Sequence, residues 1–229
     1  MVNYILDLLI ALPAVIIAIG FHESAHAFVA YKMGDNTAKN LGRLSVNPLK
    51  HIDPVGFLCL FLFHFGWAKP VPINPNNFKD KKKGAVLTAL AGPVSNLLLA
   101  FIFSIFYMAS VTAVQFFGAT GTVINVLIEM LGCCVSINVS LAIFNLIPIP
   151  PLDGAKIFGG VLPKRLYFSI MEHENIIQLV LLILLFSGAI GWLITPICTF
   201  LINIFLTCGS FIVYWIIFAV SYIGSLFIK

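Results

Sequence analysis

Long apolar runs limit what this chain can fold into more than any other feature of its sequence. Residues 4–31, 84–117 and 122–147 are each mostly apolar and longer than the roughly 20 residues that a helix needs to cross a bilayer. Charged residues make up only 10% of the chain, whereas soluble domains carry roughly a quarter. The sequence therefore predicts an all-α, multi-pass integral membrane protein with these three runs as its first spans.

Two segments between the first and second spans do not fit a membrane crossing. Residues 55–67 are apolar but too short to cross, so we expect a re-entrant or interfacial segment there. Residues 68–75 contain three prolines, which exclude a helix and allow an extended chain at a sheet edge. The predicted fold is thus a polytopic transmembrane helix bundle with a short re-entrant or extended hairpin segment.

The C-terminal helices are expected within residues 174–228, a stretch that is almost wholly apolar. Gly188 and Gly191 interrupt this stretch once, and Gly209 offers a second interruption. Either two spans or three short ones therefore fit the C-terminal part of the chain.

The distribution of basic residues predicts the orientation in the membrane. Lysine and arginine gather in residues 32–83 and 156–165, whereas the turn at 118–121 carries no charge. Basic loops are retained on the cytoplasmic side, so we expect these loops there. The net charge of +4 follows from them, and the chain has no nucleic-acid-binding pattern. With no internal repeat or second soluble domain, residues 1–229 are predicted to form one integral membrane domain, with core motifs in 15–165.

The strongest local signal is the sequence His22-Glu-Ser-Ala-His26 within the first span. On a helix the two histidines share one face and can bind one tetrahedral metal ion, and Glu23 lies beside them. Two histidines and a glutamate in this order are typical of zinc hydrolases. One aspartate at the centre of a span already costs about 2.5 kcal/mol or more. Three ionisable groups so close together favour a bound metal over packed histidines beside a stray glutamate.

A zinc site of this kind needs a third protein ligand, and Asp153 is the best candidate. Prolines at 148, 150 and 151 end the third span just before it, and Gly154 permits a tight bend just after it. The first span reaches the same side of the membrane shortly after His26. The alternative for Asp153 is an interfacial residue that caps the next helix. Weaker ligand candidates are His51, His64 and His173.

Several motifs in the same order resemble the site-2 protease family of intramembrane zinc metalloproteases. They are His-Glu-x-x-His at 22–26 and Asn-x-x-Pro-x-Pro-x-x-Asp-Gly at 145–154. Gly-Pro-x-x-Asn at 92–96 resembles a further element of that family. Residues 66–73 resemble the segment after the first span in its compact bacterial branch, which lacks added soluble domains.

The resemblance implies zinc-dependent hydrolysis of a peptide bond in or near a transmembrane segment of a membrane-protein substrate. It implies one Zn²⁺ ion per chain and a bacterial inner-membrane location with the active site toward the cytoplasm. Asn96 is implied to support the site through hydrogen bonds, although a polar contact between helices fits it equally well. The other implied roles are zinc ligation by His22, His26 and Asp153, proton transfer by Glu23, and binding of the substrate carbonyl or oxyanion by Asn145.

Two other functions fit part of the pattern. A zinc-binding membrane scaffold keeps the ligands without catalysis, but the intact Glu23 argues against it. A metal transporter lines its pathway with histidines, but transporters usually show internal repeats, and this chain shows none.

The proline-rich residues 69–75 have two interpretations. An extended edge can hold an extended peptide by strand addition, so this segment is a candidate for substrate binding. A simple proline-rich loop is the alternative.

Overall fold

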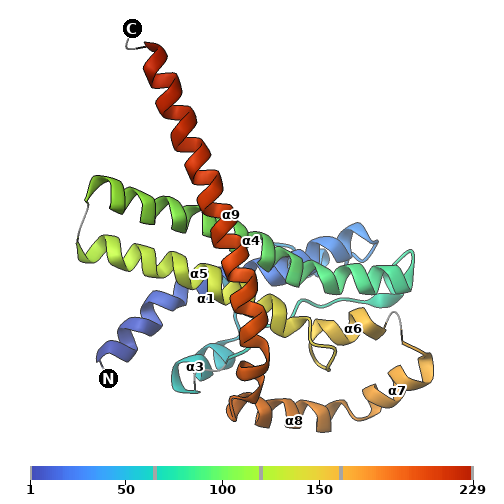
Figure 1. Ribbon diagram of the computed structural model, residues 1–229. Helices are drawn as coiled ribbons and strands as arrows, with labels where there is room; N and C mark the ends of the chain where they lie inside the picture. The colour runs from blue at the N-terminus through green and yellow to red at the C-terminus, as the bar shows by residue number, and fades with distance from the viewer. Residues whose placement is uncertain (1, 64–65, 119–120, 160–161, 228–229) are drawn as a thin grey trace.

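The computed structural model describes residues 2–63, 66–118, 121–159 and 162–227, which fold almost wholly into helices (Figure 1). Within these residues the only β pairing is one antiparallel bridge between Ile52 and Ala68. The helices are α1 (Val2–Lys32), α2 (Thr37–Asn40), η1 (Pro48–Lys50), α3 (Pro54–Phe63), η2 (Pro75–Asn77), α4 (Lys81–Phe117), α5 (Thr122–Asn145), α6 (Asp153–Gly159), α7 (Lys164–Glu172), α8 (Glu174–Phe186) and α9 (Ala189–Phe227), where η marks a 3₁₀ helix.

Four of the described helices are long and apolar enough to cross a membrane, namely α1, α4, α5 and α9. The prediction of an all-α, multi-pass integral membrane protein is therefore confirmed. The first three spans lie where the sequence predicts them, with small shifts at their ends. Helix α4 begins at Lys81 because the Asp80 side chain accepts a hydrogen bond from the Lys83 N–H (3.0 Å) and caps the helix.

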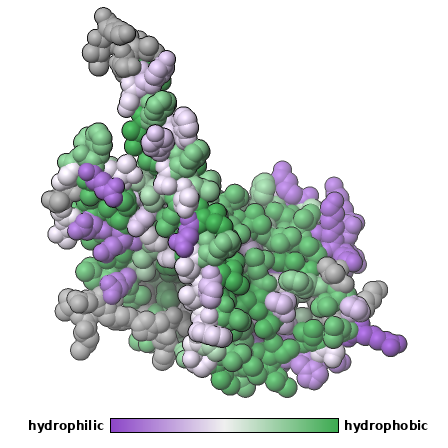
Figure 2. Space-filling model, in the orientation of Figure 1, coloured by the Kyte–Doolittle hydropathy of each residue, from purple (hydrophilic) through white to green (hydrophobic). Residues whose placement is uncertain are grey.

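Helices α1, α4 and α5 pack together at the centre of the bundle, and α9 crosses them at a steep angle (Figure 1). Figure 2 shows apolar side chains over the middle of the visible face and polar side chains toward its two ends, as expected for a surface that faces lipid. Small buried residues let helix backbones approach closely in a membrane. In the central helices they include Ala14, Ala18, Ala27 and Ala30 of α1 and Ala89, Gly92 and Ala100 of α4.

The C-terminal stretch contains fewer spans than the two or three expected. Helix α8 has 13 residues, and α9 is the one helix of spanning length in the described part of this stretch. Gly188 interrupts the stretch between α8 and α9 with a φ of +77°. Gly191 and Gly209 lie inside α9, so the expected interruption is at Gly188 alone and the optional second one at Gly209 does not occur. Helix α9 continues through Gly209, because backbone groups in lipid find no hydrogen-bond partners outside the helix.

The connection between α2 and α4 folds back on itself, with α3 as its apolar arm. The Ile52–Ala68 bridge and a hydrogen bond from the Lys69 N–H to the His51 carbonyl (2.8 Å) close its base. The predicted re-entrant run is therefore helical over most of its length, and residues 64–65 lie outside the described residues. The proline segment (residues 69–75) joins no sheet among the described residues, so the expected sheet edge is limited to the single bridge.

Gly209→Ala is expected to destabilise the protein by about 1–3 kcal/mol through overpacking. A Cβ atom at residue 209 would lie 2.9 Å from the Ser104 carbonyl oxygen of α4. Gly191→Ala is the matched control, because a Cβ there meets no atom within 4 Å, and alanine favours a helix over glycine. Thermal unfolding in detergent measures both variants. Equal melting temperatures would contradict the close α4–α9 contact.

Candidate metal centre

Two histidines and one aspartate converge at the centre of the bundle. His22 and His26 lie one turn apart on α1, with ring centroids 4.6 Å apart, and both are buried. Their Nε2 atoms lie 3.2 Å and 2.9 Å from Oδ2 of Asp153. The three candidate ligand atoms lie within 4.8 Å of one another. Two imidazole nitrogens and one carboxylate oxygen are a ligand set that zinc takes in hydrolases, with a fourth position left open.

The other ring nitrogens are held by protein acceptors. His22 Nδ1 lies 2.6 Å from Oδ1 of Asn96, and His26 Nδ1 lies 2.6 Å from the Thr88 carbonyl oxygen. Both partners accept hydrogen bonds, so both Nδ1 atoms carry the proton and both Nε2 atoms present a lone pair. The residues therefore fit a metal ion at the point that the Nε2 atoms share with Asp153.

Asn96 is itself fixed by two further hydrogen bonds. Its Nδ2 donates to the Ala18 carbonyl (3.0 Å) and to Oδ1 of Asn138 on α5 (2.8 Å). Because Nδ2 is directed to these two acceptors, Oδ1 of Asn96 must face His22. Asn138 in turn donates to the Cys134 carbonyl (2.8 Å). Sequence reasoning missed Asn138, although a polar residue in the middle of a span is a signal for it.

One face of α4 is shaped to receive the histidines. Thr88, Gly92 and Asn96 follow at intervals of four residues, so they share a helix face. A Cβ atom at Gly92 would lie 2.5 Å from His22 Cε1 and 2.5 Å from His26 Nε2. Since His22 meets Asn96 and His26 meets Thr88, α1 and α4 run antiparallel, and the rings occupy the space that Gly92 leaves open.

Asp153 begins α6 after a tight turn that follows α5. Gly154 must lack a side chain, because a Cβ there would meet the carbonyl oxygens of Leu146 and Ile147. Oδ1 of Asp153 lies 3.5 Å from Nζ of Lys156. The Lys156 ammonium favours the ionised carboxylate, which is the form in which an aspartate binds a metal ion.

Glu23 lies beside this centre, where two cavities meet. Its Oε2 accepts a hydrogen bond from the Val71 N–H (2.9 Å) of the proline segment. One cavity, of about 340 Å³, is bounded by the ligands, the proline segment and Lys156. The other, of about 550 Å³, has mostly apolar walls from α1, α5 and α8. The residues that line both cavities are His22, Glu23, Asn145 and Pro151.

The remaining candidates occupy different positions. Asn145 lines both cavities, and its Nδ2 donates one hydrogen bond to the Leu141 carbonyl (2.9 Å). His51 is buried away from the ligands, with its Nε2 2.8 Å from the Ser45 carbonyl. His173 is exposed next to the Ser169 carbonyl, and His64 lies outside the described residues. The structure thus brings together the histidine motif and Asp153 and places no other described histidine with them.

This geometry is compatible with a metal centre of the metallopeptidase type inside a bundle of helices long enough to span a membrane. A family profile described as Peptidase family M50 matches residues 10–188. The chain therefore belongs to peptidase family M50, and the resemblance to the site-2 protease family is confirmed.

Three relatives carry zinc metalloprotease names. "Putative zinc metalloprotease YwhC" of Bacillus subtilis is 37% identical over 79% of this chain and 82% of the relative. "Putative zinc metalloprotease Rip2" of Mycolicibacterium smegmatis is 29% identical over 70% of this chain and 59% of the relative. "Putative zinc metalloprotease MJ0611" of Methanocaldococcus jannaschii is 32% identical over 67% and 71%. No solved structure matches the chain.

Gly92→Ala is expected to abolish stoichiometric zinc binding, because the added methyl group occupies the space of both imidazole rings. Gly132→Ala on α5 is the matched control, since a Cβ there makes only an ordinary 3.4 Å contact with Tyr107. Metal analysis of the purified variants measures bound zinc per chain. Full zinc occupancy in Gly92→Ala would contradict the close fit of the rings against α4.

Proposed function

We propose that this protein is an intramembrane zinc metalloprotease that hydrolyses a peptide bond in or near a transmembrane segment of a membrane-protein substrate. The observation that carries the proposal is the convergence of His22, His26 and Asp153, with Glu23 beside them, inside a bundle of spanning helices. The family membership and the zinc metalloprotease names of the relatives support it.

The side chains have distinct parts in this reaction. His22, His26 and Asp153 would hold a zinc ion, which supplies a Lewis acid for the scissile carbonyl and a water of lowered pKa. Within the described residues only Oε2 of Glu23 has a hydrogen-bond partner, so Oε1 is available to accept a proton and deliver it to the leaving amine. The Asn145 amide has a second N–H beyond its bond to Leu141, which can donate to the developing oxyanion.

The two cavities suit the two parts of such a substrate. The apolar cavity is lined by Leu141, Phe144 and Leu181 among others, and it accepts an apolar segment from the bilayer. The smaller cavity lies toward the basic loops and accepts water and the polar end of the substrate. A peptide bond within a helix is already hydrogen-bonded, so the substrate must unwind locally before attack. We propose that the site lies toward the cytoplasm of a bacterial inner membrane. The basic loops lie on the same side of the bundle as the site, and such loops are retained in the cytoplasm.

The proline segment offers one backbone donor to an extended substrate. The Lys69, Val71 and Asn74 N–H groups donate to His51, Glu23 and Asp35. Residues 70, 72 and 75 are prolines without an N–H. Among the described residues the Ile73 N–H has no partner, so strand addition at this edge would use Ile73.

The catalytic assignment predicts different effects for Glu23→Ala and Asp153→Ala. Glu23→Ala retains zinc but lowers the cleavage rate at least about 100-fold, because the general base is gone. Asp153→Ala loses much of its zinc, because a ligand is gone. Glu172→Ala removes an exposed carboxylate at the end of α7 and should change neither property. Metal analysis and cleavage of a transmembrane peptide reconstituted in liposomes give both readouts. Normal cleavage by Glu23→Ala would refute the mechanism.

Strand addition predicts that Ile73→Pro raises the KM for a transmembrane peptide without lowering bound zinc, because the free N–H is removed. Val71→Pro is unsuitable for this test, since it also removes the hydrogen bond to Glu23. Ile73→Ala is the control for lost packing, because Ile73 packs against the buried Ala27, Ala38 and Val71 cluster. If Ile73→Pro and Ile73→Ala give the same KM, the backbone N–H does not bind the substrate.

A further inference from the structure

The orientation of Glu23 depends on one backbone group outside its own helix. Among the described residues the Val71 N–H is its only hydrogen-bond partner (2.9 Å, to Oε2). Val71 is buried and packs in the cluster with Ala27 and Ala38. The direction in which Glu23 presents Oε1 is therefore set by the path of the proline segment.

The proline segment cannot fix its own path. Its prolines at 70, 72 and 75 have no N–H, so no regular backbone ladder can form along it. Its position must come from groups on other parts of the chain. On the side before Val71, the Arg43 guanidinium donates to the Lys69 carbonyl (2.7 Å) and the Pro70 carbonyl (3.3 Å).

Asp35 holds the segment on the side after Val71. This residue is fully buried, and its Oδ2 accepts a hydrogen bond from the Asn74 N–H (2.7 Å). Its Oδ1 accepts from the Thr37 N–H (3.0 Å), the Thr37 hydroxyl (2.5 Å) and Nδ2 of Asn77 (2.8 Å). Burial alone would raise the pKa of Asp35, but these hydrogen bonds outweigh it and keep the pKa below its usual value.

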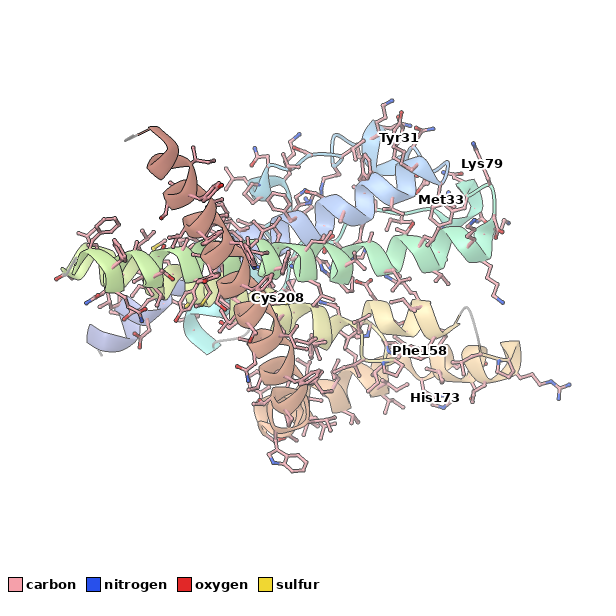
Figure 3. The ribbon with its side chains drawn as sticks, turned by 45° about the horizontal axis from the view of Figure 1, so that its top comes forward. Tyr31, Met33, Lys79, Phe158, His173 and Cys208 are labelled. Carbon is pink, nitrogen blue, oxygen red and sulfur yellow. The ribbon has the colours of Figure 1, made fainter. Side chains whose placement is uncertain are left out.

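Asp35 is also fastened to the helix that carries Glu23. Its own N–H donates to the Ala30 carbonyl in the last turns of α1 (2.9 Å). A second link joins the end of α1 to the chain that follows the proline segment, because the Lys79 N–H donates to the Met33 carbonyl (3.1 Å). Figure 3 shows Met33 and Lys79 near each other at this end of the bundle. Two carboxylates attached to one helix thus hold the proline segment at Asn74 and at Val71.

We propose that Asp35 is a positioning residue for the catalytic base. It fixes the proline segment at Asn74 so that the Val71 N–H orients Glu23 toward the metal centre. Asp35 itself touches neither the ligands nor the cavities. The inference rests on the proposed role of Glu23 and adds a residue to the machinery that neither the sequence motifs nor the ligand geometry identifies.

The test compares Asp35→Asn with Asp80→Asn. Both changes remove one negative charge on the basic side of the bundle. Asp80 accepts the Lys83 N–H at the start of α4, and asparagine caps a helix equally well. Asp35→Asn places an amide N–H₂ among four hydrogen-bond donors and releases the segment. We expect Asp35→Asn to retain zinc and to lower kcat about ten- to hundredfold, with a smaller change in KM, because the base is misplaced. Asp80→Asn should behave as wild type.

A second variant guards against misfolding of Asp35→Asn. Asn77→Ala removes one exposed donor to Asp35 and should lower kcat by a smaller factor in the same direction. Three outcomes would overturn the proposal. They are an unchanged kcat in Asp35→Asn, an increase in KM alone, and a loss of zinc together with activity in both variants. An increase in KM alone would show that the anchor serves substrate binding rather than the base.

A readout without catalysis separates this inference from the proposed function. Residues 70 and 72 are prolines, so amide hydrogen exchange across 70–72 reports on Val71 alone. We expect Val71 to exchange faster in Asp35→Asn than in wild type and Asp80→Asn. Unchanged exchange in Asp35→Asn would refute the anchor. Faster exchange in Asp35→Asn, together with a wild-type protein that cleaves no peptide, would refute the proposed function only.

Discussion

The packing of α1 against Gly92 is the constraint on which the rest of the site depends. The imidazole rings of His22 and His26 lie where a side chain of α4 would otherwise stand. This contact fixes the register of the two antiparallel helices, because a shift of α4 by one turn would remove both Nδ1 partners at once. The register in turn places Asn96 where it can also reach α5 through Asn138. The hydrogen bonds from His22 to Asn96 and from Asn96 to Asn138 therefore align α1, α4 and α5 with one another.

Much of this arrangement could be predicted from residues close together in the sequence. The spans follow from apolar length, and the histidine pair follows from the spacing of four residues on a helix. Asp153 was predictable because prolines and Gly154 hold it in a turn at the end of a span. Of the hydrogen-bond partners of the histidines, only Asn96 was predictable. The Thr88 partner was not, because it is a backbone carbonyl, which every residue carries. Gly209 was a poor guide to a helix end, because glycine is tolerated inside a lipid-embedded helix.

The environment of Glu23 shows how loops and spans cooperate. Glu23 comes from a spanning helix, but its hydrogen-bond partner comes from a segment with neither helix nor strand. Two anchors of opposite charge, Arg43 and Asp35, hold that segment on either side of Val71. A chain rich in proline loses little entropy on ordering, so a few hydrogen bonds are enough to fix it. None of these contacts was evident from sequence, because they join residues that are far apart along the chain.

The protein partners of both Nδ1 atoms have a consequence for metal exchange. In small zinc domains the metal folds the chain, and chelators unfold it. Here the ring orientations are set by Asn96, Thr88 and Gly92, which belong to a helix that packs against α1, α5 and α9. The protein's own contacts therefore hold the rings in place for an ion, and little ordering would remain to be done on binding. Removal of zinc should leave a folded apoprotein that regains the ion without refolding.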